Sequence, residues 1–266
     1  MANKMIISTW EEMYVDCLIQ VFAKVDTYGL LWFVPLVCKS WYKACRAGTY
    51  EWKVLDFQFV PESMVLSHVT KFMRLTVDRS DRLNVTRVTL PKWFEIEALD
   101  YILDQCPGLK SLALLSLPET CRRIWFCIFR QAQNLEVLEL GFFPYHLDDM
   151  LRAIRLHGIN FTSLSISSNH YITKRQASAI ANLLPNIKHL KFRGCRIEPE
   201  DLLLILKSCR ELVVFDVMDC TGFGCVDDEI LKAASHIKRF LFSKHRAINT
   251  NKAVANYQLT PFPFTG

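Results

Sequence analysis

Apolar residues recur along this chain at positions i, i+3 and i+5, and the triplet returns at a regular interval. Seven triplets follow one another at spacings of 24, 26, 26, 26, 25 and 25 residues, beginning at Val85, Leu109, Leu135, Phe161, Ile187, Leu212 and Ile237. An eighth begins at Trp52, 33 residues before the first of these. A fixed period of this length indicates a repeat architecture, because one such unit cannot bury its apolar face alone.

Each triplet predicts a short strand, and the segments between triplets have helical spacing. Helices are expected over 147–156, 174–184, 201–209 and 230–235, with Thr173 as the N-cap of the second. A strand followed by a helix, repeated, predicts an α/β fold. We expect an open solenoid of about eight strand–helix units, with a parallel sheet on the concave side and helices on the convex side.

Side chains alternate between the two faces of a strand, so residues beside the core positions point into the concavity. The concavity of a solenoid is a natural binding surface. His189, Lys191 and Arg193 share one strand, which suggests recognition of an acidic or phosphorylated segment; a solvated charged face is the alternative. The candidate substrate-binding residues on this face are Arg87, Glu139, Ser165, His189, Lys191, Arg193, Asp216 and Arg239.

The first fifty residues do not follow the repeat. Apolar positions spaced 3, 1, 3 and 3 residues apart predict an amphipathic helix over 15–25. A second short helix is expected over 30–34, between Gly29 and Pro35, and a third over 37–45 with Trp41 on its apolar face.

Both parts of the chain resemble known families. The repeats resemble leucine-rich repeats of the cysteine-containing subtype, with Asn169, Cys195 and Cys220 at the ladder position. The stretch 36–42 resembles the V-C-K-x-W core of the F-box, and 52–57 resembles its closing W-x-x-L-D-F. The usual Leu-Pro start is replaced by Met13-Tyr14. The whole resembles a short plant-type F-box/leucine-rich-repeat protein over about 246 of the 266 residues.

The resemblance implies a function. F-box proteins are substrate receptors of Skp–cullin–F-box ubiquitin ligases: the F-box docks on a Skp-type adaptor, and through it on cullin, while the second domain holds a protein substrate for ubiquitination and degradation. It implies no enzyme activity and no cofactor in the receptor itself. An interaction scaffold without ligase association is the alternative. The residues expected to form or support the adaptor face are Trp10, Met13, Leu18, Phe22, Leu31, Pro35, Val37, Cys38 and Trp41.

These patterns predict an F-box over 1–50, a repeat solenoid over 51–246 and a tail or cap over 247–266. Ten cysteines are expected to be reduced and mostly buried, with no metal site. A net charge of +5 is too small and too dispersed to favour nucleic acid. No apolar run suits a membrane span or a signal peptide, so an intracellular location in the cytoplasm, the nucleus or both is expected.

Overall fold

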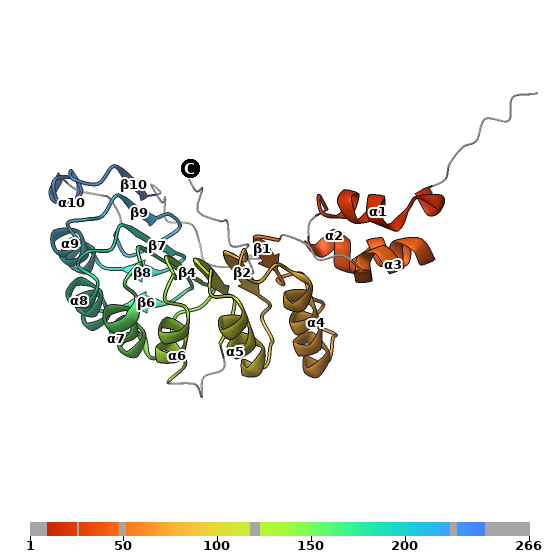
Figure 1. Ribbon diagram of the computed structural model, residues 1–266. Helices are drawn as coiled ribbons and strands as arrows, with labels where there is room; N and C mark the ends of the chain where they lie inside the picture. The colour runs from red at the N-terminus through yellow and green to blue at the C-terminus, as the bar shows by residue number, and fades with distance from the viewer. Residues whose placement is uncertain (1–9, 26, 48–51, 118–122, 224–227, 243–266) are drawn as a thin grey trace, which may run out of the picture. The chain divides into compact units, whose positions relative to one another are not determined.

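The computed structural model describes residues 10–25, 27–47, 52–117, 123–223 and 228–242 (Figure 1). The chain divides into two compact units, Met1–Leu109 and Lys110–Gly266, called unit 1 and unit 2 below. The domain boundaries expected near residues 50 and 246 fall in or beside segments outside the described residues, and those boundaries stay predictions.

Unit 1 begins with the three expected helices. They are α1 (Val15–Phe22), α2 (Thr27–Trp32) and α3 (Lys39–Ala47), with 3-10 turns η1 (Trp10–Glu12) and η2 (Val34–Leu36). The expected start of the second helix is wrong, because α2 already contains Gly29. A glycine inside a helix costs about 1 kcal/mol of stability. The burial of the next residue, Leu30, in the helical core offsets this cost.

The rest of unit 1 contains the first two strands, β1 (Val54–Asp56) and β2 (Arg87–Leu90), which pair in parallel. Between them lies α4 (Leu66–Arg79), and α5 (Ile96–Gln105) follows β2. The 14 residues of α4 account for the longer first interval of 33 residues. The sequence patterns used above did not single out either helix.

Unit 2 repeats a strand and a helix, and its helices α6–α10 lie together on one side of its strands (Figure 1). A small second sheet pairs β6 with β8 in parallel. The elements are β3 (Ser111–Leu114), α6 (Ile124–Gln131), β4 (Val137–Leu140), α7 (Leu147–His157), β5 (Ser163–Ser167), β6 (Tyr171–Ile172), α8 (Lys174–Leu183), β7 (His189–Arg193), β8 (Arg196–Ile197), α9 (Pro199–Ser208), β9 (Val214–Val217), α10 (Asp228–Ala233) and β10 (Arg239–Phe242).

The main strands pair in parallel within each unit: β1 pairs with β2 in unit 1. In unit 2 the order is β3-β4-β5-β7-β9-β10. The apolar positions of the triplets are core positions in both units. For example, Val88 and Leu90 of β2 are fully buried, and so are Leu190 and Phe192 of β7. The expected fold class, a parallel sheet built from repeated strand–helix units, is confirmed.

Two sequence details of the repeats are also confirmed. Thr173 caps α8 in a capping box, in which its hydroxyl accepts from the Gln176 backbone and the Gln176 side chain accepts from the Thr173 backbone. Cys195 and Cys220 are buried, and the Cys220 thiol donates to the Phe192 carbonyl at 3.2 Å. These cysteines therefore serve packing and local hydrogen bonding.

Within the described ranges, no helix combines the length and the apolar character needed to span a membrane.

Candidate interaction surfaces

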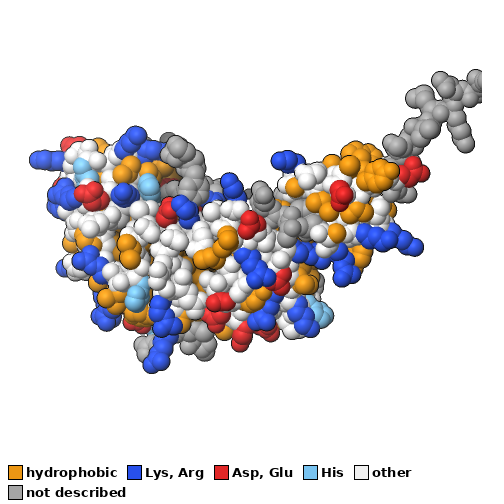
Figure 2. Space-filling view, viewed as in Figure 1, with side chains coloured by type: hydrophobic (Ala, Val, Ile, Leu, Met, Phe, Trp, Pro, Cys, Tyr) orange, Lys and Arg blue, Asp and Glu red, His pale blue; other side chains and the backbone are white. Residues whose placement is uncertain are grey.

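The helices at the start of unit 1 expose an unusual number of large apolar side chains. Tyr14 is 83% exposed and Leu36 is 81% exposed. Figure 2 shows orange side chains gathered over these helices. We call this set the apolar helical surface; its members are Trp10, Tyr14, Val21, Phe33, Leu36, Val37 and Tyr42.

The structure separates the predicted adaptor-face residues into three groups. Leu18 and Phe22 are almost completely buried, and the Phe22 ring packs on Trp41 of α3, so both residues support the surface from the helical core. Trp10 and Val37 are exposed. The half-buried residues are Met13, Leu31, Pro35, Cys38 and Trp41.

Trp41 links the N-terminal turn to the helical core. Its ring meets Trp10 at 6.2 Å and Phe22 at 5.1 Å between centroids, both edge to face. Its Nε1–H donates to the Trp10 carbonyl at 3.2 Å. Trp41 therefore packs η1 against α3.

Five members of the apolar helical surface were not among the adaptor-face residues predicted from the sequence. All five are apolar or aromatic, which in a short helical segment suggests core positions; they are Tyr14, Val21, Phe33, Leu36 and Tyr42. The available signal was the excess of apolar residues over what a core of fifty residues can bury.

In unit 2 the predicted binding residues of the strands lie on the side opposite helices α6–α10, which we call the helix-free face (Figure 1). In unit 2 one row across this face contains Ala113, Glu139, Ser165, Lys191 and Asp216 on β3, β4, β5, β7 and β9. His189 and Arg193 lie on β7 beside Lys191, and Arg239 lies on β10. Arg87 lies on β2 in unit 1. The row gathers residues that lie about 25 positions apart in the chain.

Acidic residues of other strands lie near the cationic residues of β7, and the sequence of β7 alone does not predict them. Arg193 Nη2 lies 3.5 Å from Asp216 Oδ2, and the other Asp216 oxygen accepts from the Met218 backbone at 3.0 Å. Burial, and next the Arg193 charge, lower the pKa of Lys191, while Asp216 and Glu139 act in the opposite direction. Burial also lowers the pKa of His189. The face thus carries charges of both signs rather than a purely basic strip.

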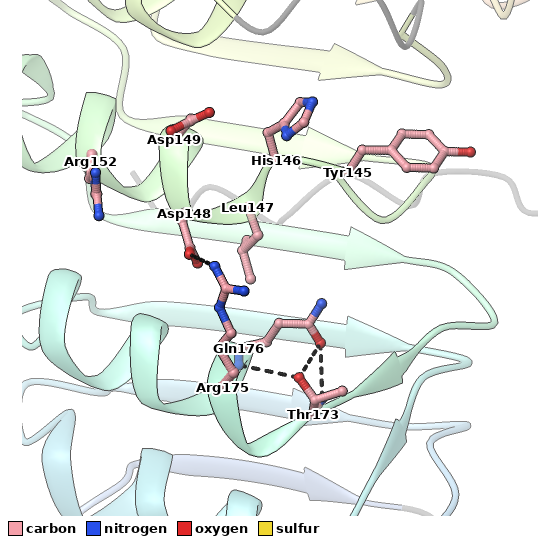
Figure 3. A pocket seen from close by; sticks show the side chains of 9 residues that line it. All are labelled: Tyr145, His146, Leu147, Asp148, Asp149, Arg152, Thr173, Arg175 and Gln176. Atoms are coloured by element: carbon pink, nitrogen blue, oxygen red, sulfur yellow. Dashed lines mark hydrogen bonds and ion pairs between the residues drawn. The ribbon is translucent and has the colours of Figure 1, made fainter.

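A polar pocket of about 470 Å³ lies where α7 and α8 begin (Figure 3). Arg175 Nη2 contacts Asp148 Oδ2 at 2.7 Å across it, and Thr173 with Gln176 closes one side. Asp149 and Arg152 add one charge of each sign. Because acids and arginines line it together, its electrostatics favour neither an anion nor a cation.

The chain is similar to curated plant proteins along most of its length. It is 26% identical to the F-box protein SKIP1 of Arabidopsis thaliana, over 89% of this chain and 86% of that protein. An F-box/LRR-repeat protein of the same organism is 24% identical over 87% of this chain and 83% of its own length. The Arabidopsis F-box protein FBW2 is 23% identical over 79% of this chain and 68% of that protein. The resemblance to F-box/leucine-rich-repeat proteins is confirmed.

Family models and solved structures give no further support to this resemblance. A scan against protein-family models finds no match. Among solved structures, an internalin from Listeria monocytogenes shares 11% identity over 68% of this chain and 66% of its own, with a TM-score of 0.27, and this likeness carries no argument.

Proposed function

We propose that this chain, an F-box/leucine-rich-repeat protein by its similarity to the Arabidopsis proteins, is the substrate-recognition subunit of a Skp–cullin–F-box ubiquitin ligase. Helices α1–α3 bind a Skp-type adaptor through the apolar helical surface. The helix-free face of the repeats binds a protein substrate. The chain contributes no catalytic group; it raises the effective concentration of substrate lysines near a ubiquitin donor that the other subunits hold.

The observation that carries this proposal is the exposure of the apolar helical surface. Seven large apolar side chains face water within 33 residues of chain, although soluble monomers rarely expose contiguous apolar patches of this kind. Three of the seven are Tyr or Trp, types that dominate the binding energy of protein interfaces. This composition supports a protein partner for these helices.

For the substrate, the presence of both charge signs on the helix-free face supports recognition of a protein segment by its own pattern of charges and by its shape. The hypothesis that His189, Lys191 and Arg193 read an acidic segment stays a prediction. Asp216 weakens it, because an incoming carboxylate or phosphate would compete with a carboxylate already beside Arg193.

The test uses Leu36→Arg, which places a charge within the apolar helical surface; because Leu36 is largely exposed, the substitution leaves the helical core intact. Co-expression with a Skp-type adaptor followed by size-exclusion chromatography should give a one-to-one complex for the unchanged chain. We expect the Leu36→Arg chain to bind at least about tenfold more weakly, because burying an unpaired guanidinium costs more than 1.4 kcal/mol.

The matched control is Ile159→Arg. Ile159 is 86% exposed and lies in unit 2, outside the apolar helical surface, so the same substitution there should leave adaptor binding unchanged. Equal binding by the Leu36→Arg chain would refute the assignment of this surface. Failure of the unchanged, folded chain to bind any Skp-type adaptor would favour the alternative function, an interaction scaffold outside the ligase.

A further inference from the structure

A groove of about 280 Å³ lies between the C-terminal ends of α7 and α8, at the opposite end of these helices from the polar pocket. Its floor is apolar, because Ile154, Leu184 and Ile187 are each no more than 6% exposed. Among the described residues that line it, Arg155 is the one charged side chain. We call it the Arg155 groove. It combines an apolar floor with a single cation at its rim.

The repeat explains why this space is open. In the preceding unit the ring of Phe129 on α6 packs edge to face on Phe161, with 5.4 Å between the ring centroids. One period of 26 residues later stand Arg155 and Ile187. Arg155 is exposed and Ile187 has no ring, so this aromatic pair has no counterpart between α7 and α8. The Arg155 groove is therefore the place that an aromatic ring occupies one unit earlier.

An arginine is an exception at this position of the repeat. Three residues before the helix C-cap, the helices α5, α6, α8 and α9 have a buried apolar residue, which is Leu103, Phe129, Ala181 and Leu206 in turn. In α7 the C-cap is Gly158, and the same position holds Arg155. Among the residues that the structure describes, the Arg155 guanidinium forms no ion pair. Its charge is thus available to a partner.

We propose that the Arg155 groove binds an acidic segment of a partner protein, with one aromatic side chain inserted in the groove and a neighbouring carboxylate paired with Arg155. The inserted ring takes the place that Phe129 has in the preceding unit, and aromatic side chains bury more apolar surface than other types. A guanidinium and a carboxylate form two parallel hydrogen bonds. Arg152, one turn earlier on α7 and also exposed, offers a second cation to a second carboxylate.

The size and charge of the groove select this kind of occupant. Small-molecule sites usually enclose about 300–1,000 Å³, so a groove of about 280 Å³ suits a single side chain better than a whole ligand. A basic segment finds no carboxylate among the described lining residues. Without Arg155, a carboxylate would meet only the negative end of α7. The preference for an acidic segment therefore depends on this side chain.

The inference does not rest on the proposed function. The Arg155 groove contains no residue of the apolar helical surface and none of the predicted binding residues of the helix-free face. If the proposed function holds, a partner segment in the groove gives unit 2 a second point of attachment, and two linked contacts bind more tightly than either alone.

The test measures the binding of a fluorescein-labelled peptide, Gly-Asp-Phe-Asp-Asp-Gly, to the full chain by fluorescence anisotropy. We expect a Kd of about 1 mM or tighter. A peptide with Ala in place of Phe loses the ring, and a peptide with Lys in place of each Asp meets Arg155 with a like charge. Both should bind at least about tenfold more weakly. An Arg155→Glu chain should reverse the preference between the Asp and Lys peptides.

Arg155→Phe copies the preceding unit and should fill the groove from within. We expect the peptide to bind at least about tenfold more weakly to this chain, and its melting temperature to rise by about 2–4 °C because the new ring is buried. The matched control is Arg130→Phe. Arg130 is exposed in the last turn of α6 and does not line the groove, so this substitution should change neither peptide binding nor, in the upward direction, the melting temperature.

Several results would overturn the inference. Equal binding of the Phe and Ala peptides would show that no ring enters the groove, and unchanged binding by both Arg155 variants would place the peptide elsewhere. A melting temperature that does not rise in the Arg155→Phe chain would show that the groove is not a vacant ring site. A dimer that the peptide dissociates would identify a second copy of the chain as the occupant. None of these measurements uses the adaptor, so their failure is distinct from failure of the proposed function.

Discussion

Trp41→Ala distinguishes a packing role from an interface role within the N-terminal helices. Trp41 contacts Trp10 and Phe22 edge to face, and its indole nitrogen donates to the Trp10 carbonyl. Each aromatic contact is worth about 0.5–1.5 kcal/mol beyond the buried area. Truncation of a fully buried aromatic costs about 3–5 kcal/mol. Because Trp41 is half-buried, we expect a loss near the lower value, about 3 kcal/mol.

The assay is hydrogen exchange of the α1 and α3 amides under native conditions, which reports the local opening of these helices alone. A loss of about 3 kcal/mol lowers the protection of these amides by about 100-fold. Tyr14→Ala is the matched control: Tyr14 is largely exposed, so its removal should change protection by no more than about twofold. A decrease of less than about fivefold in the Trp41→Ala chain would refute the packing role. Adaptor binding by the Trp41→Ala chain therefore has to be read together with its folding, whereas the Leu36→Arg chain reports binding directly.

Two other predictions concern the repeats. Thr173→Ala removes the hydroxyl of the α8 capping box and should lower the free energy of unfolding by about 1 kcal/mol in urea denaturation; Thr173→Ser keeps the hydroxyl, and an equal loss in that chain would show that the cap is not the cause. Burial raises the pKa of the Cys209 thiol from 9.0 to about 11, so the folded state holds this proton more tightly than the unfolded state. The stabilising contribution of the neutral thiol is therefore complete below pH 9 and is lost as the pH rises towards 11. The free energy of unfolding should fall more steeply from pH 8.5 to pH 10.5 in the unchanged chain than in a Cys209→Ala chain, and parallel curves would contradict the assignment.

The sequence predicted the repeats well because their determinants are local. A triplet of apolar residues at i, i+3 and i+5 marks one strand face and the turn before it, and neither requires knowledge of the partner strand. The helix start at Thr173 was recoverable for the same reason, since an N-cap acts within four residues. The early start of α2 was missed because Gly29 signals a break locally, and only the burial of Leu30 outweighs it.

The candidate sites were less accessible to the sequence. Leu18 and Leu36 are chemically identical, yet one is fully buried and the other largely exposed, because their exposure depends on how α1, η2 and α3 pack together. Likewise, Lys191 and Arg193 read as a basic strand until β9 places Asp216 beside them.

The sequence by itself determined the period of the repeat, the positions of most strands and the apolar character of the N-terminal helices, because periodicity and composition are properties of the chain alone. The tertiary structure decided which apolar side chains remain exposed for a partner, which charges meet across neighbouring strands and which charged residues are buried. These depend on contacts between segments that are far apart in the chain, and such contacts exist only once the strands are in register and the helices are packed.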